Sequence, residues 1–325
     1  MRRWTIPPSG LTLFYGDLDW GYTTTPQSPA DGRIVHCPRG KMLGGCHSHN
    51  ANAWVRGHPS DFDNWAYEGN AGWDFASVLH LFKKIEDFAG GASEYRAVGG
   101  PLHVELPTDP NPIARAFIAA AGQIGLPVVE DNNAGDMLGA SFFNFTIKNG
   151  KRNSVARAYL QPAMRRPNLT VHTHAEAHCL RFSGTRCTGV EYRREGKPAS
   201  AGAAREVIVS AGAIGSPRLL QLSGVGSGDH LRALGIPRVA HAPGVGRNLH
   251  DHPLVGGINY ETKGPPPPPR NNGAESTLWW KSDPRLICPD IQPVILEFPF
   301  ATPELAAGLP ANGYAIAYSG LAPAS

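Results

Sequence analysis

The sequence predicts an α/β protein, because two kinds of apolar pattern follow one another along its 325 residues. After Trp73 and after Asn111, apolar residues recur at the spacing of an amphipathic helix. Beyond Pro167, short apolar runs alternate with Gly, Ser and charged residues, which is typical of strands. At 207–224 a strand-like run passes through a glycine turn into a helix-like segment. We therefore expect a sheet with helices packed against it, and a second sheet beyond residue 253.

Two helices are expected in the first half of the chain. The first has Asp74 as its N-cap. Its apolar face consists of Phe75, Val78, Leu79, Phe82 and Ile85. The second has Asn111 as its N-cap and Pro112 in its first turn, and it ends at Gly125. Its apolar stripe consists of Ile113, Phe117, Ala120 and Ile124.

Short apolar runs predict the strands. Those of the first sheet are expected at 169–173, 177–182, 188–192 and 207–210. The last of them should be buried and should bring Ala211 and Gly212 to its C-terminal end, where open α/β sheets bind ligands. A helix capped by Ser216, opened by Pro217 and ended at Gly224 should follow. Strands of the second sheet are expected at 289–296 and 314–318, without the partners that later strands would supply.

A glycine pair is the strongest candidate for a ligand site. Residues 39–50 have the sequence RGKMLGGCHSHN and continue into AWVRGHPSDFD at 53–63. Gly44 and Gly45 lack a Cβ, so backbone N–H groups can approach a flat or anionic ligand there. We interpret this segment as a cofactor cradle. The alternative is a glycine-rich loop that only reverses the chain.

The segment at 39–63 closely resembles the first sequence signature of the glucose-methanol-choline (GMC) oxidoreductases, choline dehydrogenase-like members included. A second match, GAIGSPRLLQLSGVG at 212–226, resembles the second signature of that family. Shorter stretches at 99–102, 166–171 and 243–253 resemble further family landmarks. The resemblance therefore covers nearly the whole chain and implies a flavoenzyme that oxidises an alcohol with FAD.

The resemblance also implies which residues contact FAD. In the first signature these are Met42, Gly44, Gly45, Asn50, Ala51, Asn52 and Ala53. Ala177 matches a strand position whose backbone meets the adenine, although an ordinary strand residue would look the same. Ala211 and Gly212 open the second signature. Asp251 and His252 resemble a loop near the cofactor, and a simple turn is the alternative.

The implied fold is an FAD/NAD(P)-binding-type sheet domain that lacks its first βαβ unit, with an incomplete α+β substrate-binding domain. Neither the G-x-G-x-x-G turn nor its preceding strand is present before the first signature. We expect a remnant of the FAD-binding domain at 1–60, a substrate-side helical segment at 61–165, FAD-binding domain at 166–255 and an incomplete substrate domain at 256–325. The chain is therefore expected to be truncated at both ends.

The implied reaction is hydride transfer from the carbinol carbon of a small alcohol to the flavin, while a His takes the hydroxyl proton. That His is expected in a segment after residue 325, so no catalytic residue is assigned. We accordingly expect weak or absent FAD binding and no alcohol oxidation by this chain alone. The competing hypothesis is a non-catalytic remnant or interaction protein of the same fold.

Composition narrows the remaining classes of function. The chain is 41% hydrophobic and 18% charged with a net charge of +3, and its Lys and Arg residues are scattered, so nucleic-acid binding is not expected. The sequence contains no apolar run of about 18 residues, so no membrane span is predicted. We expect a cytoplasmic protein. Five widely spaced cysteines predict reduced thiols. His-x-His pairs lack a nearby carboxylate or thiolate at metal spacing, so no metal is expected.

Overall fold

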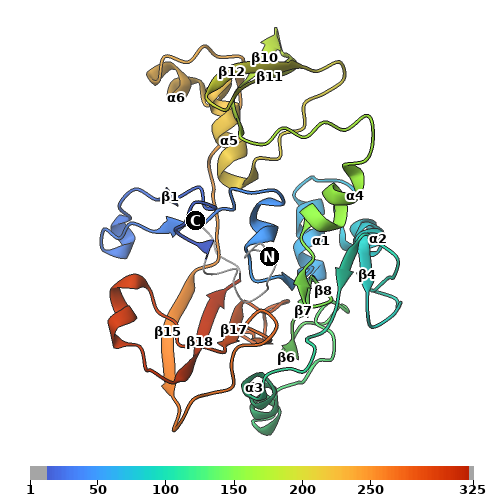
Figure 1. The fold of residues 1–325 in the computed structure, drawn as a ribbon, viewed down its shortest axis with the longest axis vertical. Helices are drawn as coiled ribbons and strands as arrows, with labels where there is room; N and C mark the ends of the chain where they lie inside the picture. Colours follow the sequence, from blue (N-terminus) through green and yellow to red (C-terminus); the bar gives the residue numbers. More distant parts are fainter. Residues whose placement is uncertain (1–12, 322–325) are drawn as a thin grey trace. The chain divides into compact units, whose positions relative to one another are not determined.

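The computed structural model describes residues 13–321, which form two compact units (Figure 1). Unit 1 contains the chain up to Arg165 and resumes at His252, while unit 2 consists of Arg166–Asp251. Unit 2 is therefore an insertion into unit 1. Both units contain strands, and both contain helices, so the predicted mixed α/β class is confirmed.

The largest element of unit 1 is a five-stranded antiparallel sheet. Its order is β15 (Leu254–Glu261), β18 (Gly313–Gly320), β17 (Ile291–Leu296), β16 (Ser276–Trp279) and β6 (Gly139–Phe142). Buried and half-buried residues alternate along β17 and β18, as expected for strands with one face on a core. The strands predicted at 289–296 and 314–318 are confirmed. The expectation that they lack partners is wrong, because each has a neighbour on both sides.

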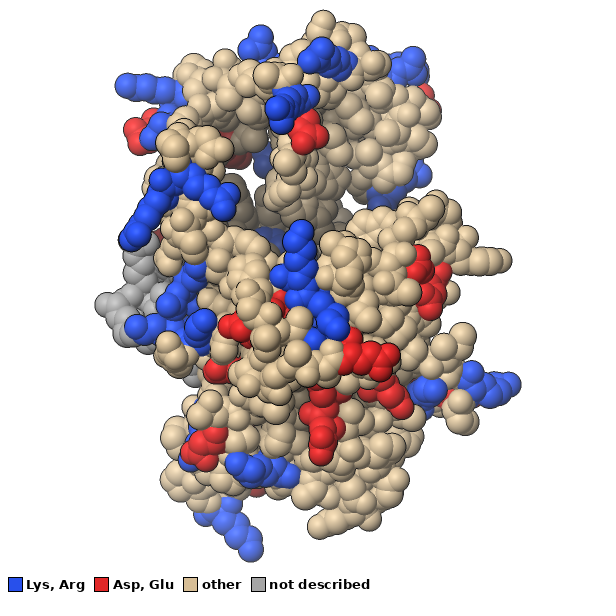
Figure 2. Space-filling model, turned by 90° about the vertical axis from the view of Figure 1, so that its right-hand side faces the viewer, with Lys and Arg blue, Asp and Glu red and all other residues tan. Residues whose placement is uncertain are grey.

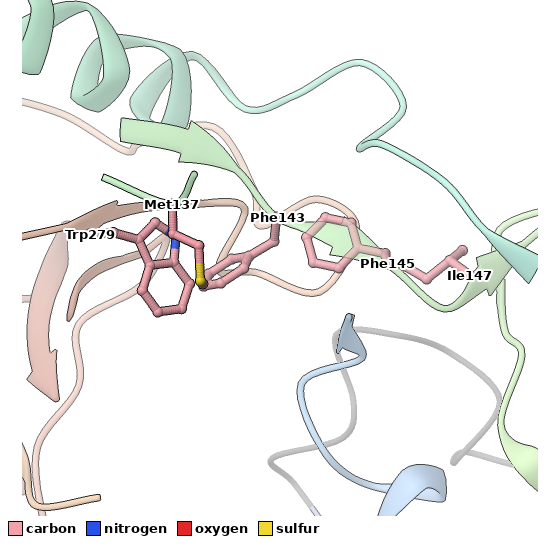
Figure 3. Packing of buried hydrophobic residues seen from close by; sticks show 5 residues of the cluster. All are labelled: Met137, Phe143, Phe145, Ile147 and Trp279. Carbon is pink, nitrogen blue, oxygen red and sulfur yellow. The ribbon is translucent and has the colours of Figure 1, made fainter. Parts of the chain in front are cut away.

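A cluster of buried hydrophobic residues joins this sheet to the neighbouring loops (Figure 3). It consists of Met137, Phe143, Phe145, Ile147 and Trp279. In Figure 3, Met137 and Trp279 lie side by side at one end of the cluster and Ile147 lies at the other. Ala53 and Val55 pack against it from the segment that follows the glycine pair. The core therefore fixes the C-terminal end of the predicted cofactor cradle.

The longer helices of unit 1 begin at side-chain N-caps. The helices of this unit are α1 (Pro59–Tyr67), α2 (Phe75–Ile85), α3 (Pro112–Gln123) and the single turn α4 (Gln161–Ala163). The Asp74 side chain accepts a hydrogen bond from the Ser77 N–H at 2.9 Å, and the Asn111 side chain accepts one from the Ile113 N–H at 3.1 Å. Both predicted N-caps are confirmed.

The buried face of α3 differs from the predicted stripe. Ala114 and Ala121 are its buried residues, whereas Ile124 is 76% exposed. Ile124 is the C-cap residue, and the chain turns away at Gly125, whose φ is +81°. The predicted apolar stripe thus extends one residue past the helix, which ends at Gln123.

Short strand pairs complete unit 1. They are β1 (Tyr22–Thr23) with β2 (His36–Cys37), β3 (Ala53–Trp54) with β7 (Asn144–Phe145), β4 (Glu86–Phe88) with β5 (Leu102–Val104), and β8 (Ile147–Lys148) with β9 (Lys151–Arg152). The short helical turns are η4 (Ser28–Ala30), η5 (Gly45–Ser48), η6 (Ala156–Leu160) and η7 (Pro303–Gly308). Of the strand pairs, β4 with β5 is parallel and the others are antiparallel.

Unit 2 is built on a three-stranded antiparallel sheet. Its strands are β10 (Ala175–Ser183), β11 (Arg186–Arg194) and β12 (Lys197–Gly202), followed by α5 (Gly212–Leu222), β13 (Val225–Gly226), α6 (Gly228–Ala233) and β14 (Ala240–His241). The strands predicted at 177–182 and 188–192 are confirmed within β10 and β11. The helix α5 packs on β10, and the Ser223 hydroxyl accepts a hydrogen bond from the Leu180 N–H at 2.7 Å.

Two strand predictions in unit 2 are wrong. Neither 169–173 nor 207–210 pairs with another strand among residues 13–321. Ile208 is 79% exposed, so the run at 207–210 is not buried. A strand forms only where a neighbour takes its backbone hydrogen bonds, and apolar composition alone does not supply that neighbour.

The start of α5 also differs from the prediction. The helix begins at Gly212, and Ala211 is its N-cap. Ser216 lies inside the first turns, and its hydroxyl accepts a hydrogen bond from the Ala211 N–H at 2.9 Å. Pro217 also lies inside the helix. Ser216 therefore contacts the start of the helix from within it. The helix begins earlier in the chain than the predicted cap at Ser216.

A pair of buried carboxyl groups attaches α3 to the large sheet. Glu275 and Glu297 are 0% and 1% exposed, and their side chains contact each other. The Asn111 N–H donates to Glu275 Oε2 at 2.6 Å, and Asn111 Nδ2 donates to Glu297 Oε2 at 2.9 Å. Burial and the neighbouring Glu275 raise the pKa of Glu297 to about 7.

This raised pKa makes the stability of unit 1 depend on pH. Because the folded-state pKa lies above the unfolded value of 4.5, the contribution is complete below pH 4.5 and is lost as the pH rises through about 7. Glu297→Gln should remove it. Over that pH range, we expect the free energy of unfolding of the unmutated protein to fall by about 1–3 kcal/mol relative to that of this variant.

Urea unfolding at several pH values measures the difference. Glu261→Gln, which changes an exposed residue of β15, should leave the pH profile unchanged. Parallel profiles for the unmutated protein and Glu297→Gln would contradict the assignment.

Candidate functional site

The glycine pair adopts a backbone shape that other residues disfavour. Gly44 has a φ of +89°, and a Cβ there would lie 2.4 Å from Ser48 Oγ and 3.1 Å from Ala156 Cβ. Gly45 has a φ of +53°, and a Cβ there would meet nothing within 4 Å. A Cβ on Gly40 would lie 2.5 Å from the carbonyl oxygen of Gly45. The chain is therefore closely packed behind Gly44 and open in front of Gly45.

The residues after η5 form a turn that a neighbouring segment holds in place. Asn52 is 1% exposed with a φ of +61°, and its Nδ2 donates to the carbonyl oxygen of Thr146 at 3.0 Å. The Thr146 N–H donates in return to the carbonyl oxygen of Asn52 at 3.0 Å. Ala51 accepts a hydrogen bond from Asn272 Nδ2 at 2.7 Å. An asparagine at position 52 is thus a buried cross-link between two segments.

Arg152 lies under the same turn, and none of the sequence motifs predicts it. The side chain is 1% exposed, and its Nη1 donates to the carbonyl oxygen of Asn50 at 2.6 Å and to Asn50 Oδ1 at 3.2 Å. The signal that could have found it is the Asn149-Gly150 pair, which predicts a two-residue hairpin turn. That turn pairs Ile147 with Arg152 and so places the arginine at the buried end of the hairpin.

His47 is a neutral histidine in this environment. Burial lowers its pKa to about 4, and the positive charge of Arg152 adds to the effect. Its Nε2 lies 2.9 Å from Thr146 Oγ1, and that hydroxyl donates to the carbonyl oxygen of Asn52 at 3.3 Å. His47 is therefore the donor to Thr146, with the proton on Nε2. Burial also lowers the pKa of His49.

A network of buried charges holds the strand that follows the turn. Arg56 Nη2 lies 2.6 Å from Glu86 Oε2, and Arg96 Nη2 lies 2.8 Å from Glu86 Oε1. Arg96 also lies 2.8 Å from Asp131. Trp54 Nε1 donates to Glu86 Oε1 at 3.0 Å. Two cations and two carboxylates thus balance one another and fix β3.

A cavity of about 460 Å³ in unit 1 begins beside Ala53. Its walls are Ala53, Val55, Gly57, His58, Asp61, Met137, Phe143, His252, Trp279, Cys288, Pro289, Gln292 and Leu321. The indole of Trp279, the phenyl ring of Phe143 and the thioether of Met137 make one wall apolar. Gln292, Asp61 and two imidazoles supply polar groups. Such a mixed lining is typical of a small-molecule site.

The predicted site residues divide between the two units. The turn in unit 1 brings together Met42, Gly44, Gly45, Asn50, Ala51, Asn52 and Ala53. His252 lines the cavity that begins at Ala53. In unit 2, Ala177 borders a separate hollow of about 390 Å³, and Gly212 opens α5 with a φ of +83° after Ala211. Asp251 is exposed at the end of unit 2.

Side chains of both signs lie on the face of the molecule that Figure 2 shows. Figure 2 shows Lys and Arg spread over one face of the molecule with Asp and Glu between them. Among residues 13–321, no group of three or more His, Cys, Asp or Glu side chains could hold a metal ion. A search of the same residues finds no helix that is long and apolar enough to cross a membrane. The cytoplasmic location stays a prediction.

Comparisons with known proteins identify the class. A family model for GMC oxidoreductases matches residues 12–254. Mitochondrial choline dehydrogenase of Mus musculus is 46% identical over 72% of this chain and 39% of its own length. Oxygen-dependent choline dehydrogenase of Brucella ovis is 43% identical over 72% of this chain and 42% of its own length. The chain thus spans about two fifths of these relatives.

Solved structures agree with the sequence comparison. The crystal structure of pyridoxine 4-oxidase from Mesorbium loti superposes with a TM-score of 0.94 at 34% identity, over 100% of this chain and 65% of the other. Formate oxidase of Aspergillus oryzae superposes with a TM-score of 0.86 at 23% identity, over 100% of this chain and 66% of the other, which shows the fold.

The fold is therefore the mixed α/β fold of a GMC flavoprotein, as the sequence predicted. The chain belongs to the GMC oxidoreductase family, whose cofactor is FAD.

The turn in unit 1 fits a flat cofactor. Gly45 leaves open space where any other residue would place a Cβ, and Asn50 is exposed beside it. Asn52 Oδ1 is buried and has no hydrogen-bond partner in the described part of the chain. The closed side is held by Thr146 and Arg152, so the open side alone is available to a ligand.

The two glycines should respond differently to alanine. Gly44→Ala combines a left-handed backbone with a steric clash and should cost about 2–4 kcal/mol of folding free energy. Gly45→Ala meets only the backbone strain and should cost about 1–2 kcal/mol. Urea unfolding measures both. Equal losses would contradict the closed and open sides described above.

The lowered pKa of His47 predicts a second pH effect. Because the folded-state pKa lies below the unfolded value of 6.5, the stabilisation is complete above pH 6.5 and is lost as the pH falls through about 4. Over that pH range, the free energy of unfolding of the unmutated protein should fall by about 1–3 kcal/mol relative to that of His47→Gln. Titration of the His47 ring by NMR should give a midpoint near 4. A midpoint at 6.5 would refute the burial argument.

Proposed function

We propose that the protein is an FAD-dependent oxidoreductase that acts on the CH–OH group of a small alcohol. The observation that carries this proposal is the turn from Gly44 to Ala53, which is open at Gly45 and directly adjoins a cavity with an apolar wall and polar groups. Membership of the GMC family and the names of the relatives support it. Bound FAD would accept the hydride of the alcohol.

The residues of unit 1 have distinct proposed roles. Met42, Gly44, Gly45 and the run from Asn50 to Ala53 would lie against the flavin ring, with the side chain of Asn52 turned toward Thr146. Gly44 and Gly45 allow the backbone to approach it, and Asn50 contributes polar contact. In unit 2, Ala177, Ala211 and Gly212 stay predictions of cofactor contact, as does the Asp251-His252 pair. The four-part division of the domains also stays a prediction.

The cavity beside Ala53 is proposed to hold the alcohol. Trp279, Phe143 and Met137 would bury the carbon skeleton, and Gln292 would hydrogen-bond to the hydroxyl group. Choline, the substrate in the names of two relatives, would present a cation to the aromatic wall and to Asp61. Pyridoxine, named for the structural neighbour, would present a flat ring to the same wall.

A non-catalytic protein of the same fold is the second candidate. Several apolar side chains of β15 are exposed, and they could support association with another protein. These are Leu254 at 55%, Val255 at 59% and Ile258 at 40%. Such a protein would not oxidise an alcohol.

Flavin absorbance separates the two candidates. The purified chain is incubated with FAD and desalted, and choline, pyridoxine or benzyl alcohol is added without oxygen. The lack of a G-x-G-x-x-G turn predicts weak FAD binding, whereas the intact turn at Gly44–Ala53 supports binding. On the proposed function we expect retained flavin that loses its absorbance with at least one alcohol. Retained flavin that no alcohol reduces would favour the non-catalytic candidate. A colourless protein would agree with the weak binding expected from the sequence and would overturn the proposal.

Gln292→Leu tests the cavity. It should raise the KM for the alcohol by about tenfold, the equivalent of one lost hydrogen bond, and leave FAD affinity unchanged. An unchanged KM would show that the alcohol binds elsewhere.

A further inference from the structure

The amide of Asn50 has a fixed orientation. Its Oδ1 accepts two hydrogen bonds, from the Asn52 N–H at 3.0 Å and from Arg152 Nη1 at 3.2 Å. Its Nδ2 is the other terminal atom of the amide and has no hydrogen-bond partner among residues 13–321. A flipped amide would set Nδ2 against two other donors, which is unfavourable. Asn50 is an exposed residue, so the two N–H groups of its amide are available to a ligand.

Arg152 is itself held rigidly. It is 1% exposed, lies in the β8–β9 hairpin and also donates to the carbonyl oxygens of Asn50 at 2.6 Å and His47 at 3.4 Å. Burial lowers its pKa to about 10, so it remains charged at neutral pH. A charged guanidinium offers donors only, so it can face Oδ1 but never Nδ2.

We infer that Arg152 is a positioning residue that turns the Asn50 amide so that its Nδ2 donates to FAD. This inference rests on the proposed function, since it takes the exposed side of Asn50 as the side of the cofactor. The flavin carries acceptor nitrogen and carbonyl groups, which suit two N–H donors. Arg152 itself lies behind the turn and acts through Asn50.

A double-mutant cycle tests this coupling. FAD dissociation constants are measured by fluorescence for the unmutated chain, Asn50→Ala, Arg152→Met and the double variant. Each single change should weaken binding by about tenfold, the loss of a charge-assisted or ligand hydrogen bond. Adding Arg152→Met to Asn50→Ala should weaken it less than Arg152→Met alone does, because the amide to be oriented is already gone and only the bonds of Arg152 to the carbonyl oxygens of Asn50 and His47 are lost.

Two further variants separate positioning from general support. Arg152→Lys keeps a charged donor and should recover part of the affinity lost in Arg152→Met. Lys151→Met removes an exposed charge from the same strand and should leave FAD affinity unchanged. Equal weakening by Arg152→Met with and without the Asn50 side chain would overturn the inference and leave the proposed function standing.

If the chain takes up no FAD, that result contradicts the proposed function itself. The same four proteins are then compared by urea unfolding, which needs no cofactor. Arg152→Met should lower the folding constant at least about threefold less in the Asn50→Ala background than in the unmutated chain. Additive effects would show that Arg152 does not hold the Asn50 side chain, and the inference would be overturned.

Discussion

The turn between Gly44 and Ala53 depends on hydrogen bonds that come from a distant part of the chain. Apart from a single turn of helix at η5 it contains little regular structure. Backbone carbonyl groups of the turn accept hydrogen bonds instead from Thr146, Arg152 and Asn272. Buried polar groups without partners would destabilise the turn, so these cross-links stabilise it. They also leave one side of it closed and one side open.

Ion pairs between buried side chains stabilise the segment that follows the turn. Arg56, Glu86, Arg96 and Asp131 lie in contact, and the two buried arginines are paired with the two carboxylates. Removal of one partner would leave a buried charge without compensation, which is far more costly than the net value of the pair. The guanidinium of Arg96 also lies 3.6 Å from the ring centre of Phe88. The position of β3 is thus strongly determined before any ligand binds.

The sequence could predict contacts between residues that are close together in the chain. It could not predict contacts between residues that are far apart in the chain. The caps at Asp74 and Asn111 are contacts between residues two or three apart, so the local pattern was sufficient. Arg152 contacts Asn50 across 102 positions, and no spacing rule connects them. The strand predicted at 207–210 failed for a similar reason, because a strand requires a partner that its own composition does not reveal.

Ala53 connects the two halves of the candidate site. It is the last residue of the turn and the first of β3, where it pairs with Phe145 of the buried cluster. It also lines the cavity of about 460 Å³. Hydride transfer requires the reacting carbon and the acceptor to be in contact, at about 3–3.5 Å. In the proposed reaction, a small residue shared by the turn and the cavity would leave room for that contact, and its pairing with Phe145 would fix where it occurs. The same core that stabilises the fold thereby determines the geometry in which the proposed reaction would take place.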